Sequence, residues 1–109
     1  MRIGERVFCA RVAETEAERM TGLRGAAPLG PDEALLLPFP VEDELCIVND
    51  GVSFPIDVAW ADATGAVIAI ERAFPANDGT PRCHGPARDV LETAAGALDG
   101  VEIGARLER

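Results

Sequence analysis

The sequence predicts a small protein of mainly β structure, with short strands and little helix. It contains 11 Gly and 8 Pro among 109 residues, spaced so that they divide the chain into short segments. Several of these segments are β-branched or alternate apolar and polar residues, as strands do. Hydrophobic residues make up 48 % of the chain and charged residues 27 %, as in ordinary globular proteins. We therefore expect a single domain over residues 1–109, since this length supplies one core.

The first expected elements are a strand and a short helix. Residues 6–13 alternate and contain β-branched side chains, which predicts a strand. Residues 15–18, Thr-Glu-Ala-Glu, form a capping-box pattern in which the Thr and Glu side chains satisfy each other's backbone N–H groups. We expect the helix that follows to end near Gly22 or Gly25. Met20 has the helical spacing of a core contact.

The middle of the chain predicts four further strands. They cover residues 34–37, 45–48, 54–61 and 67–70. Pro38-Phe39-Pro40 should end the first of them, because proline cannot donate a hydrogen bond to a strand ladder. The turn at residues 62–65 should join the last two strands as a hairpin.

The last third of the chain is harder to assign. Residues 73–86 contain three prolines and two glycines, which predicts a long loop. Residues 87–98 are ambiguous, because Pro86 and the Ala-rich tail favour a helix whereas Val90-Leu91 fits a strand equally well. Residues 101–107 alternate like a half-exposed strand.

The charge balance is unusual for a chain of this size. There are 19 acidic and 10 basic residues, for a net charge of -9, and every basic residue is Arg. Nucleic-acid binding depends on basic patches, so DNA and RNA are not expected partners. We interpret the acidic, Lys-free surface as adaptation to concentrated salt, where screening removes self-repulsion. The alternative interpretation is codon preference for Arg in a GC-rich genome.

The beginning of the chain and the cysteines bear on location. No apolar stretch follows the first basic residues, which predicts neither a signal peptide nor a membrane segment, and hence a cytoplasmic protein. Cys9, Cys46 and Cys83 are an odd number at wide spacing without a CxxC pair. This pattern argues against a disulfide framework or a zinc ribbon, so we expect three reduced thiols.

Four stretches, taken together in this order, carry a resemblance to a known family. They are Glu18-Arg19-Met20-Thr21-Gly22-Leu23; Ala34-Leu35-Leu36-Leu37; Gly51-Val52-Ser53-Phe54-Pro55-Ile56-Asp57-Val58, followed by Asp62 and Gly65; and Val90-Leu91-Glu92 with Ala95-Gly96. The chain resembles the widespread prokaryotic family called domain of unknown function 192. The resemblance spans nearly the whole chain, and the family has no established activity.

The resemblance implies an α+β fold that is mainly β, with a small barrel-like mixed sheet and one short helix near the start. It also implies a strand at residues 88–93, which confines any second helix to about residues 94–98. Three positions depart from the family pattern. Asn49 stands where a Met is usual, Val48 where an aromatic residue is typical, and Ala105 where an Asp usually follows Gly. If these residues line a shared pocket, this member has altered it.

Two carboxylates stand out within apolar strand segments, Asp57 and Glu92. Because burying an unpaired charge is costly, either group should accept hydrogen bonds from backbone N–H groups or from an Arg, with Arg19, Arg24 and Arg88 as candidates. We expect a structural role above all for Glu92, and an amide replacement that lowers stability by about 1–3 kcal/mol. The candidate binding residues are Arg19, Asn49, Asp57, Arg88 and Glu92.

The sequence supports two classes of function. The expected one is a non-catalytic binding or accessory domain for a small molecule or another protein, without a cofactor or metal. The alternative is a small hydrolase-type enzyme that uses Asp57 and Glu92 as acid and base, if their carboxyl groups converge in a pocket. Cys83-His84 supplies only two metal ligands, and adjacent side chains of an extended segment point apart, which disfavours both a metal site and a nucleophile pair.

Overall fold

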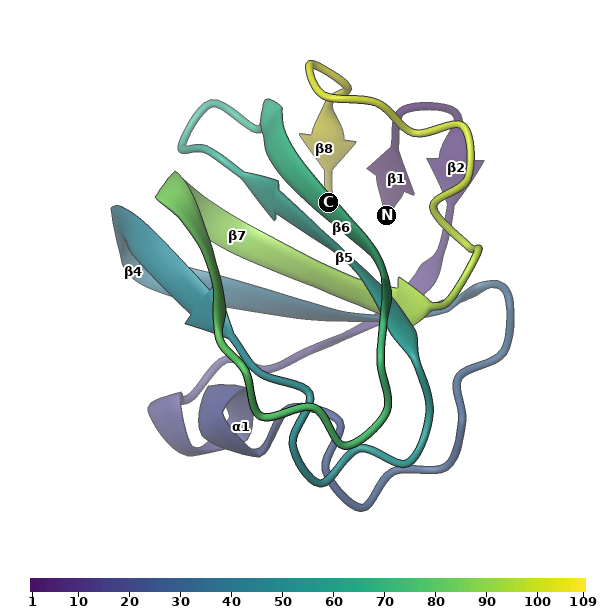
Figure 1. The fold of residues 1–109 in the computed structure, drawn as a ribbon. Helices are drawn as coiled ribbons and strands as arrows, with labels where there is room; N and C mark the ends of the chain where they lie inside the picture. Colours follow the sequence, from purple (N-terminus) through teal and green to yellow (C-terminus); the bar gives the residue numbers. More distant parts are fainter.

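The computed structural model describes all 109 residues, which form two small sheets and one helix (Figure 1). The elements are β1 (Arg2–Ile3), β2 (Arg6–Val7), β3 (Cys9–Val12), α1 (Glu16–Thr21), β4 (Glu33–Ile47), β5 (Ile56–Ala61), β6 (Val67–Phe74), β7 (Arg82–Ala94) and β8 (Leu107–Glu108). One sheet has three strands in the order β2-β1-β8, and the other has five in the order β3-β4-β7-β5-β6. Mainly β structure with one short helix is therefore confirmed.

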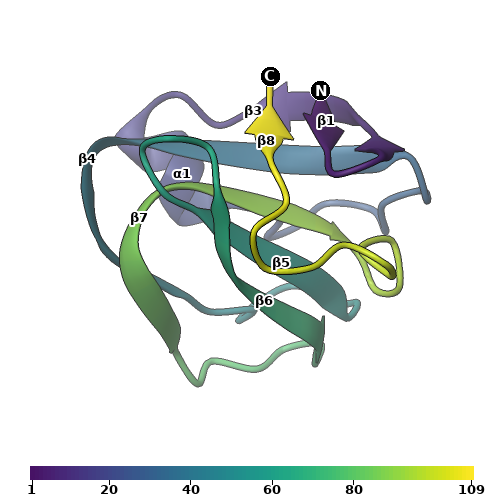
Figure 2. The same ribbon diagram turned by 90° about the horizontal axis from the view of Figure 1, so that it is seen from above.

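The larger sheet is open, so the expectation of a barrel-like sheet is wrong. The strand order begins at β3 and ends at β6, and these two edge strands do not pair with each other. The sheet is mixed as expected, since β3 runs parallel to β4 whereas the other neighbours are antiparallel. The five-stranded sheet is curved, but it is not closed into a barrel. The long strands β4 and β7 bend together, so that a single sheet wraps around one side of the core (Figure 2).

β4 is one bent strand where the sequence predicts two. Its pairing with β7 shifts register between Pro38 and Asp43 and again between Asp43 and Leu45. Prolines are tolerated at such irregularities because no ladder hydrogen bond is required there. Pro38 and Pro40 therefore lie in the bend and do not end the strand. The first arm of β4 pairs with residues 89–93 of β7, and the second arm pairs with residues 82–87.

The long loop expected at residues 73–86 is also wrong. β6 continues to Phe74 and β7 begins at Arg82, which leaves only residues 75–81 between them. Gly85 and Pro86 lie within β7, opposite the bend of β4, where the register is irregular. The hairpin of β5 and β6 through residues 62–65 is confirmed, as is the strand at residues 88–93.

The predicted cap of α1 is confirmed in detail, but the role of Met20 is wrong. The Thr15 hydroxyl accepts a hydrogen bond from the Glu18 N–H at 3.1 Å, and the Glu18 carboxylate accepts one from the Thr15 N–H at 3.1 Å. The helix has only six residues, ends at Gly22 and buries none of its side chains. Met20 is consequently 69 % exposed, and the core contact is made by Leu23 just beyond the helix.

The end of the chain contains turns where a second helix was expected. β7 ends at Ala94, and Gly96 and Gly100 adopt positive φ angles of 86° and 83° in the turns that follow. These left-handed conformations interrupt a helix at 94–98. β8 covers Leu107–Glu108 and so overlaps the strand expected at 101–107 only at Leu107, because Gly104 also turns the backbone.

The core forms two clusters on opposite faces of the larger sheet. One cluster contains Trp60, Phe74, Val58 and Val90, together with Leu23 after the helix. The other contains Leu91 and Ala59, together with Ile3 and Leu107 of the small sheet. All six residues of β5 are buried, because both of its faces are covered. The direction in which a β5 or β7 side chain points therefore decides which of two separate interiors it enters.

Cys46 and Cys83 form a disulfide, which corrects the expectation of three free thiols. The two residues are 37 positions apart in sequence but are direct partners in the β4–β7 ladder. This proximity depends on the bend of β4 and is invisible in the spacing of the cysteines. Cys9 is the free cysteine, and it is exposed.

Candidate functional site

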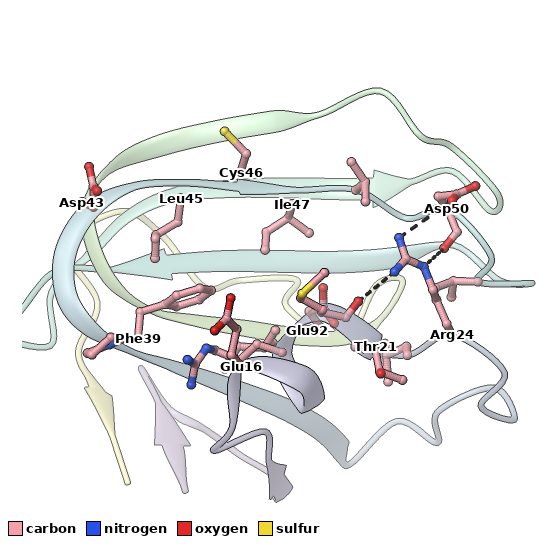
Figure 3. A pocket seen from close by; sticks show the side chains of 18 of the residues that line it. Glu16, Thr21, Arg24, Phe39, Asp43, Leu45, Cys46, Ile47, Asp50 and Glu92 are labelled. Carbon is pink, nitrogen blue, oxygen red and sulfur yellow. Dashed lines mark hydrogen bonds and ion pairs between the residues drawn. The ribbon is translucent and has the colours of Figure 1, made fainter.

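A pocket of about 590 Å³ opens between α1, the segment after it and the two arms of β4 (Figure 3). Its walls are largely apolar. Leu37 and Phe39 come from the first arm and the bend of β4, and Leu45 and Ile47 come from the second arm and point toward the helix. Leu23 contributes from the segment after α1. The bend of β4 creates the hollow, because it folds the two arms over one another and leaves the space between them to be closed by α1.

Glu92 of β7 lies inside this pocket. Its carboxyl group is the unusual feature of the site, because it makes no hydrogen bond and no ion pair while the residue is only 4 % exposed. The loop after α1 passes beside it, since a Cβ added at Gly22 would lie 3.8 Å from Glu92 Oε1. Burial raises the pKa of Glu92 to about 7. The expectation that Glu92 would be paired is wrong.

The two arginines that line the pocket are committed to other partners. Arg19 Nη1 donates to the backbone oxygens of Glu14, at 2.8 Å, and Pro38, at 3.1 Å, and its guanidinium lies over the Phe39 ring. Arg24 donates to the backbone oxygens of Met20, at 2.8 Å, and Asp50, at 3.0 Å. These contacts tie α1 and the segment after it to the rim of the pocket. Neither guanidinium pairs with Glu92.

Asp57 is buried on the other face of the sheet and is fully hydrogen-bonded. Its Oδ1 accepts from the Ala73 N–H at 2.9 Å, and its Oδ2 accepts from the Gly96 N–H at 2.9 Å and the Leu98 N–H at 3.1 Å. A carboxylate with three backbone donors organises the turn after β7 and the bulge in β6. The expectation of backbone partners is confirmed for Asp57.

The register of β5 and β7 separates the two carboxylates. Asp57 is opposite Thr93 and Val58 is opposite Glu92, and partners that face each other across a ladder point to the same side of the sheet. Asp57 and Glu92 therefore project into the two different interiors. They do not converge, which removes the basis for an acid and base pair made from these residues.

The remaining residues proposed from the sequence lie outside the pocket. Asn49 is 1 % exposed, and its amide donates to the Phe54 oxygen at 3.0 Å and the Pro75 oxygen at 2.9 Å, which holds two connections together. Its Oδ1 has no partner. Arg88 is exposed and donates to the Phe39 oxygen at 3.0 Å. Only Arg19 and Glu92 of the five candidates share the pocket.

Of the positions that depart from the family pattern, only Val48 lines the pocket. Ala105 packs against the cluster on the opposite face. Sequence reasoning missed the apolar wall of the second β4 arm, because its contribution depends on the bend. A usable signal was present in Glu18-Arg19-Met20-Thr21-Gly22-Leu23, where a methionine on a very short helix precedes a glycine, and this segment forms one side of the pocket.

Cys83 and His84 are adjacent in sequence, but their side chains have different partners. Cys83 is bonded to Cys46, so neither sulfur offers a thiolate for metal binding or attack, although Glu44 lies beside both. His84 Nε2 lies 2.8 Å from Glu71 Oε2, and Arg82 Nη1 lies 3.0 Å from Glu71 Oε1. The hydrogen bond with His84 is the main cause that lowers the pKa of Glu71.

Comparisons with known proteins place the chain among uncharacterised relatives. No curated protein matches the sequence. A crystal structure of a protein of unknown function from Novosphingobium aromaticivorans DSM 12444 is similar, with a TM-score of 0.92 and 26 % identity over 95 % of this chain and 76 % of that one.

A second solved structure is a candidate transcription regulator from Sinorhizobium meliloti 1021, with a TM-score of 0.89 and 23 % identity over 93 % of this chain and 81 % of that one. That likeness concerns the fold. The single helix of this chain is too short to cross a membrane. The family model DUF192, described as uncharacterized ACR, matches residues 1–109, so the chain belongs to the DUF192 family.

Proposed function

We propose that this chain is a non-catalytic binding domain that takes a small molecule in the pocket between α1 and β4. The observation that carries the proposal is Glu92, which is 4 % exposed, lines a largely apolar pocket, and has a carboxyl group without a hydrogen-bond partner in the protein. A polar group in such a place costs stability unless something satisfies it. A ligand that donates to Glu92 and fills the apolar walls would do so.

The dimensions and lining fit this role. Small-molecule sites usually enclose about 300–1,000 Å³ and combine apolar walls with a few polar groups that fix orientation. The pocket here has a volume of about 590 Å³, and Glu92 is the only buried polar residue in its lining. The β4 part of the wall is held in place by the ladder with β7 and by the disulfide, so that side of the site is preformed on a rigid element.

The separation of Asp57 from Glu92 favours binding over the alternative hydrolase-type enzyme. General acid and base catalysis needs both groups within reach of one substrate. Asp57 is saturated by three backbone donors on the far face, which leaves Glu92 without a catalytic partner of its own kind.

Salt adaptation remains part of the proposal, whereas the expected cytoplasmic location has to be weighed against the disulfide. The net charge of -9 supports salt adaptation and disfavours nucleic acid as a partner. The disulfide counts against a cytoplasmic location, because structural disulfides persist mainly in oxidising compartments. Fractionation of the source cells with an antibody to this protein would decide between the cytoplasm and an oxidising compartment.

The binding role can be tested with a neutral fluorescent probe, N-phenyl-1-naphthylamine, which becomes bright in apolar sites. We expect saturable enhancement with the wild type and a loss of at least fivefold in affinity with Val48→Trp, because Val48 lines the pocket and is only partly buried. Val7→Trp is the matched control, since Val7 is 59 % exposed and does not line the pocket.

Equal probe binding by the wild type and both variants would show that the probe sits elsewhere and would contradict the proposal. No saturable enhancement with the wild type would do the same. Thermal unfolding of each variant, measured in parallel, ensures that a change in binding is read on folded protein.

A further inference from the structure

We infer that the ligand of the α1–β4 pocket is an apolar molecule with a protonated amine, and that the ammonium group pairs with Glu92. The inference rests on the proposed binding function and deepens it by naming the chemical class of the ligand. Four observations support it: the unpaired carboxyl group, the engaged arginines, the excess of acidic side chains around the pocket, and the apolar walls.

The first observation concerns what Glu92 lacks. A buried carboxylate usually has a cation or several N–H donors, as Asp57 has on the other face. Glu92 has neither, although it is 4 % exposed. A primary ammonium brings one positive charge and three donors in a small volume, which suits a single carboxylate at the end of an apolar pocket.

The second observation excludes an internal partner for Glu92. The basic side chains that line the pocket are Arg19 of α1 and Arg24 after it, whereas Arg82 and Arg88 of β7 lie outside the lining and bond to Glu71 and to the Phe39 oxygen. Arg19 bonds to the backbone oxygens of Glu14 and Pro38, and Arg24 bonds to those of Met20 and Asp50. Redirecting Arg19 to Glu92 would break its contact with β4 at Pro38, and redirecting Arg24 would break its contacts with Met20 and Asp50. The cation must therefore come from outside the chain.

The third observation is the charge around the opening. The acidic side chains that line the pocket are Glu16 of α1, Asp43 of β4, Asp50 after β4, and Glu92 itself. They outnumber the two arginines, and the whole chain carries a net charge of -9. Such a field attracts cations and opposes the entry of carboxylates and phosphates.

The apolar walls define the rest of the ligand. Phe39, Leu45 and Ile47 line the same pocket as Glu92 (Figure 3), and so does Leu37. An ammonium alone would leave these walls in contact with water, whereas an amine with an aromatic or branched aliphatic body would cover them. Strongly hydrated polyamines and inorganic cations do not fit this lining.

The test compares three molecules that differ in one group: 2-phenylethylamine, 2-phenylethanol and 3-phenylpropionate. Binding is measured at pH 8 and 0.1 M salt by NMR titration of nitrogen-15-labelled protein. For the wild type we expect the amine to bind at least tenfold more tightly than the alcohol, with the acid weakest, and with shifts at Gly22, Leu45 and Ile47. Glu92→Gln should reduce the preference for amine over alcohol to less than threefold.

Glu102→Gln is the matched control, because Glu102 is exposed, does not line the pocket, and removes the same charge from the chain. It should keep the full preference for the amine. A second measurement needs no variant: the preference of the wild type should fall at pH 5, since Glu92 is protonated there while the amine stays charged. Burial, which raises the pKa of Glu92 to about 7, gives the reason.

Each outcome has one meaning. Equal affinity for amine and alcohol in the wild type would overturn the inference. It would leave the binding function intact, provided that Val48→Trp weakens the binding of the fluorescent probe. A preference for amine that survives both Glu92→Gln and pH 5 would also overturn it. Shifts confined to exposed acidic residues outside the pocket would assign the amine to the surface field alone, which again contradicts a site at Glu92.

Discussion

Asp57 and Glu92 are buried acidic residues on neighbouring strands, yet the carboxyl group of Asp57 is hydrogen-bonded and that of Glu92 is not. Asp57 enters the interior that the small sheet covers and accepts hydrogen bonds from three backbone N–H groups. Glu92 enters the interior beside α1 and accepts none. The two residues occupy adjacent rungs of the β5–β7 ladder, so one step in register changes the environment of a carboxylate completely.

The difference separates a structural role from a candidate functional one. A fully hydrogen-bonded buried carboxylate holds loops in place and stabilises the fold. An unpaired one destabilises the fold, and such groups are common at binding sites, where a ligand completes them. If Asp57 is structural and Glu92 is functional, substitutions at the two residues should change stability in opposite directions, and the larger effect is expected at Asp57.

Removal of the Asp57 carboxylate should cause the greatest loss of stability. Asp57→Ala leaves the N–H groups of Ala73, Gly96 and Leu98 without this acceptor, and the Leu98 N–H is buried whereas the other two are partly buried. A buried donor left unsatisfied costs about 1–3 kcal/mol and the partly buried donors cost less, so we expect a loss of about 4 kcal/mol in the free energy of unfolding for the three together. Urea denaturation in molar salt measures it, with Asp32→Ala as an exposed control. A loss below 1 kcal/mol would show that Asp57 is not a structural anchor.

Glu92 should produce the reverse effect, with a marked pH dependence. Burial raises the pKa of Glu92 in the folded protein to about 7, from an ordinary value of 4.5. Between these values the folded state binds a proton that the unfolded state has lost, so stability falls as the pH rises and the full penalty is present above pH 7. The difference corresponds to about 3 kcal/mol.

Glu92→Gln removes this penalty, so the variant should be more stable than the wild type at pH 8 and similar to it at pH 4. Urea denaturation of both proteins from pH 4 to pH 8 is the measurement, and Glu102→Gln is the control for the loss of one charge. A Glu92→Gln variant that is less stable than the wild type at pH 8 would indicate that Glu92 has a structural role.

Reduction of the disulfide should affect the side of the molecule that contains Glu92. The bond fastens the second arm of β4, which carries Leu45 and Ile47, to β7. We expect Cys46→Ser with Cys83→Ser to lower stability by about 2 kcal/mol and to weaken probe binding in the pocket. Hydrogen exchange should accelerate in residues 43–48 and stay unchanged at Gly96 and Leu98. Thiol titration should find one free cysteine without reductant and three after reduction; three without reductant would exclude the bond.

Salt should have the smallest effect and should act on both carboxylate variants alike. Screening of a net charge of -9 should raise the melting temperature by about 5 °C between 0.05 and 2 M NaCl, which corresponds to about 1 kcal/mol. Asp57 and Glu92 are buried, so the stability difference between their variants should persist in high salt. Differential scanning calorimetry tests both statements, and a flat melting temperature would remove the proposal of salt adaptation.

Local features of the fold could be predicted from the sequence. The cap at Thr15, the end of the helix at Gly22, and the hairpin through residues 62–65 depend on neighbouring residues, and each is present. The strand at residues 88–93 needed the family resemblance, because propensity alone left it ambiguous. The resemblance also suggested closure into a barrel, which the open order of the sheet contradicts.

Features that depend on distant partners could not be predicted. The continuation of β4 through Pro38 and Pro40 needs the matching irregularity in β7, and the disulfide follows from that same bend. The opposite environments of Asp57 and Glu92 follow from the β5–β7 register, which no local pattern contains. The sequence identified both carboxylates as unusual but favoured the structural role for Glu92, which lacks the hydrogen bonds such a role requires.

The small sheet has a practical consequence for labelling or immobilising this protein through its termini. Arg2 and Glu108 are direct ladder partners, and antiparallel partners have Cα atoms about 5 Å apart. The two termini therefore emerge together, well away from α1 (Figure 1). A reporter fused to either end, or a tether to a sensor surface, would be attached away from α1, which borders the pocket.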